Sequence, residues 1–364
     1  MLDALSNRLV AGGVPIARCW LHTRTLHPNY AGLSRIWQPG QPIVARLLDY
    51  GFEQTEAYLR SPVRLVVAQR AHLRWRLDEA DTALLPVLAE LRDAGHRDYA
   101  IWPVIYSDGA INVVSWTTRE AAGFTAAQIA VLEGLLPVLA MTMEVKSLRR
   151  FATNTLATYV GREPADLILH GQIRRGDVRT TTAALMLVDL RDFTALSDML
   201  PPDLVIETLN RYFDCVIPPV RRRGGEIIKF MGDAILVMFN EGPGRNARDA
   251  CQAAMDAAAE ALAALNHSNA GSNAPGLHAW FALHHGAVSY GNIGTGDRLD
   301  FTVIGPDVNL TSRIERLCRD IDRQVVMSAT FAALIDRPMQ EIGHFNIRGF
   351  ARMQLLFGLP PQAA

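Results

Sequence analysis

The chain has no excess of either sign of charge, and this argues against the simplest polyanion-binding proteins. Its 364 residues carry 36 Lys and Arg against 37 Asp and Glu, a formal net charge of −1. Proteins that follow a phosphate backbone have a clear positive excess, so we expect no nucleic-acid partner. Small anionic ligands, which need only local positive charge, stay open as partners.

Cysteines and long apolar runs are also scarce. The four cysteines have no CxxC spacing and lie in apolar or helical surroundings: Cys19, Cys215, Cys251 and Cys318. We expect reduced, buried thiols, as in a cytosolic protein. The N-terminus lacks the pattern of a secretory signal, and the longest apolar segment, 131–145, is interrupted by charge and proline and is shorter than the ~20 residues that span a bilayer. The sequence predicts a cytoplasmic protein with no membrane anchor.

The length favours two domains, since ~150 residues per domain is typical. In the first half, apolar residues at helical spacing indicate helices at 81–94 and 125–146. Two apolar runs, 99–106 and 110–116, are joined by Ser107-Asp108-Gly109 and indicate a β-hairpin, because Asp-Gly readily adopts the positive φ values of tight turns. Residues 1–146 are therefore expected to form an α+β domain.

Residues 80–147 resemble the second half of a GAF-type sensor domain in their order of helix, hairpin, loop and long helix. The resemblance implies a regulatory domain with a possible small-molecule ligand, and the alternative is a structural domain that only supports dimerisation. Trp102, Tyr106 and Trp116 either line a pocket or belong to the core.

The second predicted helix continues through an apolar face to Gly161 and is expected to form a dimer stalk. Residues 147–181 are thus assigned to a helical linker. Near its end, Arg174, Arg175 and Arg179 are interpreted as a solvated loop and not as a phosphate site.

From residue 182 the pattern changes to strand, helix, strand, strand. One apolar strand ends in Asp189, a helix is predicted at 202–220, and a hairpin at 226–237 contains Asp233. If these strands pair, the two aspartates converge, and convergent carboxylates bind hard divalent cations.

The remainder of the chain completes a mixed α/β domain at 182–364. A strand at 277–285 is followed by Gly286, Gly291 and Gly294, which we assign to turns. Further helices and closing strands are predicted at 246–265, 308–317, 324–327, 342–347 and 353–358.

Four motifs in order, DLRDFT, IIKFMGDAILVMF, GNIGTGDRLDFTVIG and DVNLTSRIERL, resemble the class III nucleotidyl cyclase catalytic domain. The resemblance covers roughly residues 182–358. It implies a ferredoxin-like βαββαβ core in an α/β (α+β) fold. By the same resemblance the chain is an adenylate cyclase, a phosphorus–oxygen lyase that converts ATP to 3′,5′-cyclic AMP and pyrophosphate in signal transduction.

The resemblance also implies a metal site. Asp189 and Asp233, with the backbone of Leu190, match the positions that hold two Mg²⁺ or Mn²⁺ ions on the triphosphate. One ion would lower the pKa of the ribose 3′-hydroxyl, and the other would neutralise the leaving pyrophosphate.

Phosphate contacts are implied at Phe193, Thr194 and Gly232, and at Arg348 in the NIRGF stretch. The family usually has glycine where Asp192 stands. A carboxylate there would repel a triphosphate unless it points away.

Lys229 and Thr302 match the base-reading positions of the family. A lysine ammonium can donate to adenine N1, and a threonine oxygen can accept from the N6 amine, so ATP is favoured over GTP. Asn309 and Arg313 match the residues that orient the ribose and stabilise the transition state, and their i, i+4 spacing places them on one helix face. For Arg313 the alternative is a surface ion pair with Asp307 or Glu315.

Family members divide these residues between two subunits, so the resemblance implies a head-to-tail homodimer with two equivalent sites. An alternative function is a catalytically silent, cyclase-like nucleotide-binding or signalling scaffold. A diguanylate cyclase is disfavoured, because Arg223-Gly224-Gly225-Glu226 is followed by two isoleucines where that family has an acidic residue and phenylalanine.

Overall fold

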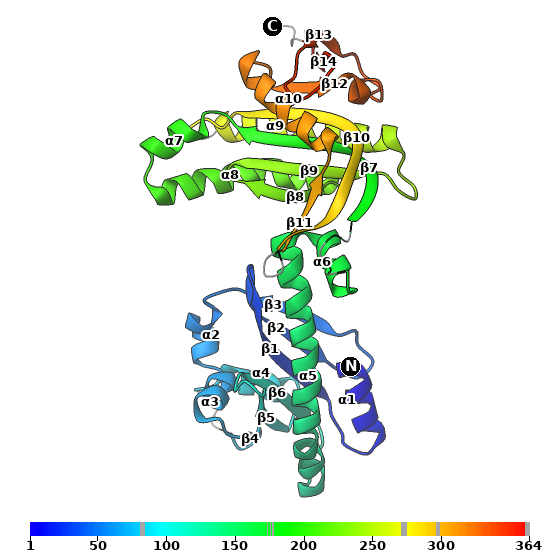
Figure 1. Cartoon of the computed structure of the whole chain (residues 1–364). Helices are drawn as coiled ribbons and strands as arrows, with labels where there is room; N and C mark the ends of the chain where they lie inside the picture. The colour runs from blue at the N-terminus through cyan, green and yellow to red at the C-terminus, as the bar shows by residue number, and fades with distance from the viewer. Residues whose placement is uncertain are drawn as a thin grey trace. The chain divides into compact units, whose positions relative to one another are not determined.

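A computed structural model describes residues 1–80, 84–172, 174, 176, 178–270, 275–295 and 299–360 (Figure 1). Contacts divide the chain into two compact units, Met1–Thr155 and Leu156–Ala364. Each unit is built on its own sheet.

The N-terminal unit contains a six-stranded antiparallel sheet with the order β3-β2-β1-β6-β5-β4. Its strands are β1 (Arg18–His27), β2 (Tyr30–Trp37), β3 (Val44–Leu48), β4 (Leu73–Arg76), β5 (Asp98–Ile105) and β6 (Ile111–Thr118). The predicted hairpin is therefore confirmed as β5 and β6, with Gly109 at φ 83° in the turn.

Successive side chains along these strands point to opposite faces of the sheet, and apolar side chains form a hydrophobic core on each face. Trp102 and Trp116 belong to one core, and their neighbours Ile101 and Val113 belong to the other. Both tryptophans are almost fully buried, which supports the core interpretation of these aromatics. Tyr106 packs at the edge of the same core.

Helices cover both faces of this sheet. Helices α1 (Leu2–Ala11) and α5 (Ala126–Val160) supply residues to the first core, and α3 (Pro62–Gln69) and α4 (Pro86–Asp93) supply residues to the second. The one-turn helices η1 (Phe52–Gln54) and α2 (Glu56–Leu59) precede α3. The predicted helix 81–94 is shorter than expected, and residues 81–83 lie outside the described residues.

Helix α5 is continuous over 35 residues, although Pro137 lies within it. It is the one helix of the described residues that is long and apolar enough to cross a membrane, by length and composition alone. The expectation that this apolar segment is too short was wrong, because neither the glutamate nor the proline ends the helix.

The C-terminal unit has an eight-stranded sheet whose path runs β13-β14-β12-β10-β7-β9-β8, with β11 paired to β10. The chain order β7-α8-β8-β9-α9-β10 and the strand order β10-β7-β9-β8 are those of a ferredoxin-like βαββαβ motif. The strands are β7 (Val178–Leu190), β8 (Glu226–Met231), β9 (Ala234–Asn240), β10 (Ala279–Gly294), β11 (Leu299–Ile304), β12 (Val325–Ser328), β13 (Gln340–Phe345) and β14 (Gln354–Gly358).

The helices of this unit are α6 (Arg162–Leu169), α7 (Phe193–Met199), α8 (Pro202–Arg222), α9 (Ala247–Ala270), α10 (Pro306–Asp320) and α11 (Ala329–Ala332). Helices α8 and α9 pack on the sheet face that contains Met186, and α10 packs on the face that contains Leu185 and Leu187. All four cysteines of the chain are buried and free of disulfides, as expected.

The turns assigned to Gly286, Gly291 and Gly294 were wrong. These glycines lie within β10, which pairs with β7 without interruption from Ala279 to Gly291. Gly286 instead allows the side chain of Asp307 to pack closely against β10, because a Cβ atom at this position would lie 2.3 Å from Oδ2 of Asp307. The same Oδ2 atom of Asp307 accepts a hydrogen bond from the backbone N–H of Ala287, at 2.7 Å.

Candidate active site

Two neighbouring strand ends position the predicted metal-binding aspartates. Asp189 is the penultimate residue of β7, and Asp233 lies in the two-residue turn between β8 and β9, after Gly232 at φ 68°. Because β7 pairs with β9 up to Val188 and Ile235, the two carboxyl groups meet and hydrogen-bond to each other. The predicted convergence of these strands is therefore observed.

These aspartates open on a cavity of about 470 Å³. Of the residues singled out in the sequence, it is lined by Asp189, Leu190, Phe193, Thr194 and Asp233. The structure thus gathers the expected metal positions and two of the four expected phosphate positions, Phe193 and Thr194, in one hollow, whereas Gly232 and Arg348 do not line it.

Asp192 also lines this cavity and directly precedes helix α7. Its backbone is left-handed, at φ 58° and ψ 23°, a conformation that glycine adopts freely and that aspartate tolerates better than most residues. Its Oδ2 lies 3.4 Å from Nε of Arg191. The aspartate therefore keeps a glycine-like loop conformation, and its charge has a cationic neighbour.

The carboxyl groups of Asp189 and Asp233 lie so close together that their negative charges would repel each other. Burial raises the pKa of Asp189, and burial together with the hydrogen bond and charge of Asp189 raises the pKa of Asp233 to about 7. The backbone N–H of Leu190 donates to Asp233 and opposes this rise. A divalent cation would relieve the repulsion between the carboxylates, so this pair fits the expected metals.

No group of three or more His, Cys, Asp or Glu within the described ranges is arranged to hold a metal. Mg²⁺ commonly binds through one or two carboxylates and takes its other ligands from phosphates and water. The pair Asp189 and Asp233 therefore suits an ion that arrives with a nucleotide better than a permanently caged ion.

Three further residues surround Asp189, and the sequence analysis missed their place in the site. Glu315 is 5% exposed and contacts Asp189, and Nη2 of Arg319 lies 3.4 Å from Oδ2 of Asp189. Tyr212 is fully buried close to the same carboxyl groups, whose negative charge adds to burial in raising its pKa. The i, i+4 spacing of Glu315 and Arg319 was a visible signal, but only the tertiary fold shows that they face the aspartates.

Helix α10 presents two different faces. At 100° per residue, Asn309 and Arg313 lie within about 40° of each other, whereas Arg313 and Glu315 are about 200° apart. Neither Asn309 nor Arg313 lines the aspartate cavity. Glu315 faces Asp189, so the alternative that it forms a surface ion pair with Arg313 was wrong.

The predicted base-reading residues lie on two other strands. The ammonium group of Lys229, on β8, forms an ion pair with Asp300 of β11. Asp300 and Thr302 lie on the same face of β11, because side chains alternate along a strand. The structure therefore places Lys229 and Thr302 in one neighbourhood, through an aspartate that the sequence analysis did not consider. Arg348 is exposed between β13 and β14, outside the aspartate cavity.

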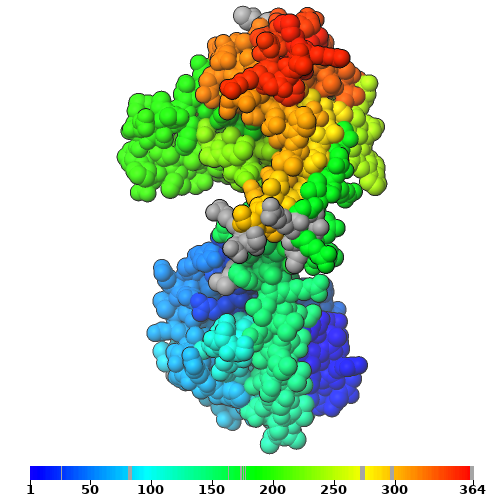
Figure 2. Space-filling model, viewed as in Figure 1, coloured from blue at the N-terminus to red at the C-terminus, as the bar shows by residue number. Residues whose placement is uncertain are grey.

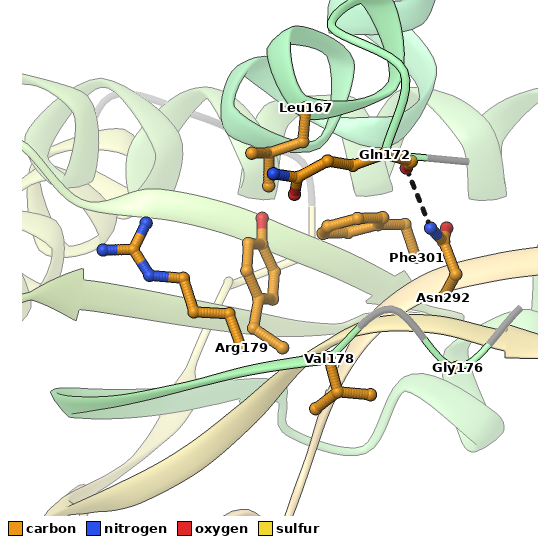
Figure 3. Close-up of a pocket in the computed structure, with 8 residues that line it drawn as sticks. Leu167, Gln172, Gly176, Val178, Arg179, Asn292 and Phe301 are labelled. Atoms are coloured by element: carbon orange, nitrogen blue, oxygen red, sulfur yellow. Dashed lines mark hydrogen bonds between the residues drawn. The ribbon is translucent and has the colours of Figure 1, made fainter. Parts of the chain in front are cut away.

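A second cavity, of about 450 Å³, lies between the hairpin formed by β10 and β11, helix α6 and the start of β7. Figure 3 shows the amide of Asn292 donating to the carbonyl oxygen of Gln172, at 3.0 Å. The N–H of Gly176 donates back to the carbonyl oxygen of Asn292, also at 3.0 Å. These bonds attach the segment before β7 to the strand that pairs with Thr302.

Comparison with known proteins identifies this domain. Residues 177–357 match the family model of the adenylate and guanylate cyclase catalytic domain. This part of the chain belongs to that family. The chain is 33% identical over 191 residues to adenylate cyclase 1 of Rhizobium meliloti (strain 1021), and 27% identical over 196 residues to an adenylate cyclase of Anabaena cylindrica.

Those alignments cover 50% and 53% of this chain but only 28% and 37% of the two relatives, so the chain matches about a third of the length of these relatives. Among solved structures, a bacterial light-regulated adenylyl cyclase is similar with a TM-score of 0.52 and 21% identity, over 62% of this chain and 64% of that one. At this identity the structural likeness supports the fold.

Proposed function

We propose that this protein is an adenylate cyclase that converts ATP to 3′,5′-cyclic AMP and pyrophosphate. The observation that carries the proposal is the cavity that Asp189 and Asp233 line together with Phe193 and Thr194. Membership of the cyclase family supplies the reaction class, and the choice of ATP rests on Lys229 and Thr302.

Asp189, Asp233 and the carbonyl of Leu190 are the groups that would hold Mg²⁺ or Mn²⁺, two ions per site. Bound there, the metal would acidify the 3′-hydroxyl and neutralise the leaving pyrophosphate. The chain itself contributes orientation: the loop from Leu190 to Thr194 and Asp233, in the turn after Gly232, line the hollow where a triphosphate would lie.

Adenine would be selected by hydrogen-bond polarity. The ammonium of Lys229 donates to N1 of adenine, and Oγ1 of Thr302 accepts from the N6 amine. Guanine presents an N–H at N1, where a lysine has no acceptor to offer. The ion pair of Lys229 with Asp300 is solvent-exposed and contributes ~0–1 kcal/mol, so the lysine can exchange partners at little cost.

The complete site is proposed to need two copies of the chain. Asn309 and Arg313 lie on the face of α10 turned away from the aspartates, so they would serve the cavity of a second copy. In a head-to-tail homodimer this exchange generates two equivalent sites. Arg313 would then face the triphosphate, where its planar guanidinium suits developing phosphate charge.

The N-terminal unit is proposed to be a GAF-like regulatory domain with a small-molecule ligand, in a cytoplasmic protein. Its single antiparallel sheet, covered on both faces and followed by the long helix α5, supports this proposal. Binding of a ligand could then be coupled to the reaction through the mutual orientation of two cyclase domains.

The choice of base can be tested with Lys229→Met, which keeps the apolar stem and removes the donor. With MnATP and MnGTP compared at equal concentrations, the native protein should favour ATP, and the variant should lose most of that preference. The matched control is Lys146→Met on α5, which should change nothing. A native protein that binds ATP without turnover would instead support the silent-scaffold alternative.

A further inference from the structure

One apolar stripe on helix α5 is not covered by the N-terminal unit. Its members are Val131, Val138, Met141, Val145 and Leu148, whose exposed fractions are 49, 63, 68, 66 and 60%. A contiguous exposed stripe of this size is unusual on a helix that packs on a sheet, because isolated apolar residues are the normal case at a protein surface.

The opposite side of the same helix is buried against the sheet of the N-terminal unit. Leu132, Leu139 and Met143 are at most 5% exposed and belong to the core on the sheet. The uncovered stripe therefore points away from the sheet, and Figure 2 shows α5 as a surface ridge of the N-terminal unit.

The stripe has the spacing of a coiled coil. Val131, Val138 and Val145 are separated by seven residues, and Met141 and Leu148 follow the second and third valine by three. These are the a and d positions of a heptad. Among parallel coiled coils, a β-branched residue at a with leucine at d favours two strands, and Val145 with Leu148 has this pattern.

Charge supports the parallel direction. In this heptad frame Glu144 is a g position and Arg149 is the e position of the next heptad, five residues later. In a parallel pair these two positions face each other across the interface, with opposite charges. In an antiparallel pair g faces g and e faces e, which opposes like charges. Ser107 donates its backbone N–H to Oε2 of Glu144 at 3.0 Å and so helps to orient the carboxylate.

A lipid bilayer is a poorer occupant of the stripe, although α5 is apolar enough by composition. A spanning helix must turn apolar groups to lipid all round, whereas this helix packs one side on the sheet and carries Glu133, Glu144 and Lys146. A second copy needs only the exposed side.

We propose that residues 131–148 of α5 pair with the same residues of a second copy in a parallel, in-register, two-stranded coiled coil. The functional importance of this contact rests on the proposed function, in which two cyclase domains complete each other. A parallel pair delivers both α5 C-terminal ends to the same end of the coil, where each chain continues into its cyclase domain.

The test is disulfide cross-linking of the full chain carrying Val145→Cys, since equivalent a positions are adjacent only in a parallel, in-register pair. The control is Arg150→Cys, which is also exposed but lies at the outer f position. The native cysteines are buried and should stay silent. Under mild oxidation we expect most of the Val145→Cys protein to become covalent dimer, and little of the control.

Equal cross-linking of the two variants, or none for Val145→Cys, would overturn the proposal. So would recovery of the native protein as a monomer by sedimentation, or its partition into neutral phosphatidylcholine vesicles. The Val145→Cys protein should also be assayed for cyclic nucleotide. Cross-linking without cyclic nucleotide would overturn the proposed function and leave the coiled coil intact, whereas cyclic nucleotide without cross-linking would do the reverse.

Discussion

The division of the site between two chains makes a quantitative prediction for mixed dimers. Asp233→Asn removes a carboxylate from the metal cavity, and Arg313→Ala removes a guanidinium on the outward face of α10. Homodimers of either variant should be inactive, because each of their two sites lacks one essential group.

A heterodimer of the two variants should recover activity. One of its sites then combines the intact aspartates of one chain with the intact Arg313 of the other, and its second site contains both substitutions. Since one of two equivalent sites is intact, the turnover per dimer should be about half that of the native protein.

The assay is cyclic AMP formation by heterodimers that are co-expressed with two different tags and purified through both. The control heterodimer combines Asp233→Asn with Asp189→Asn, and because each site is then damaged in its metal half, it should be inactive. Recovery in the control, or an inactive Asp233→Asn/Arg313→Ala heterodimer of confirmed composition, would refute the shared site.

Three further predictions follow from the geometry. The raised pKa of Asp233 keeps its carboxyl group protonated below about pH 7 when no metal is bound. The Mn²⁺ affinity measured by calorimetry should therefore fall about tenfold for each pH unit below about 7. An affinity that does not change with pH would contradict Asp189 and Asp233 as the metal site. Asp192→Gly should preserve the loop and strengthen ATP binding, measured as a lower KM, whereas a higher KM would show that the carboxylate helps. Gly286→Ala should lower the unfolding free energy by about 1–3 kcal/mol in urea titrations, because its Cβ would collide with Asp307, and an unchanged midpoint would count against that contact.

Much of the site could be predicted because its parts are local in sequence. Asp189 and Asp233 follow apolar strands that the pattern of side chains reveals, and pairing of those strands alone brings the two together. The separation of Arg313 from the cavity also follows from helical periodicity once α10 is known to pack on the sheet.

The errors arose where tertiary contacts override local preference. Glycine often marks a turn, but Gly286 lies within a strand. The strand has glycine at this position because the carboxylate of Asp307 occupies the space that a side chain would need. Glu315 is a charged residue on a helix, which predicts exposure, yet it is buried against Asp189. The pairing of Lys229 with Asp300 joins residues 71 positions apart, and no local pattern indicates it.

The most direct test of the account is the reaction of the purified chain with MnATP. Cyclic AMP and pyrophosphate should appear in equal amounts, ATP should be preferred over GTP, and Asp189→Asn should abolish both products. A dimeric, folded protein that forms no cyclic nucleotide from either substrate would contradict the central claim.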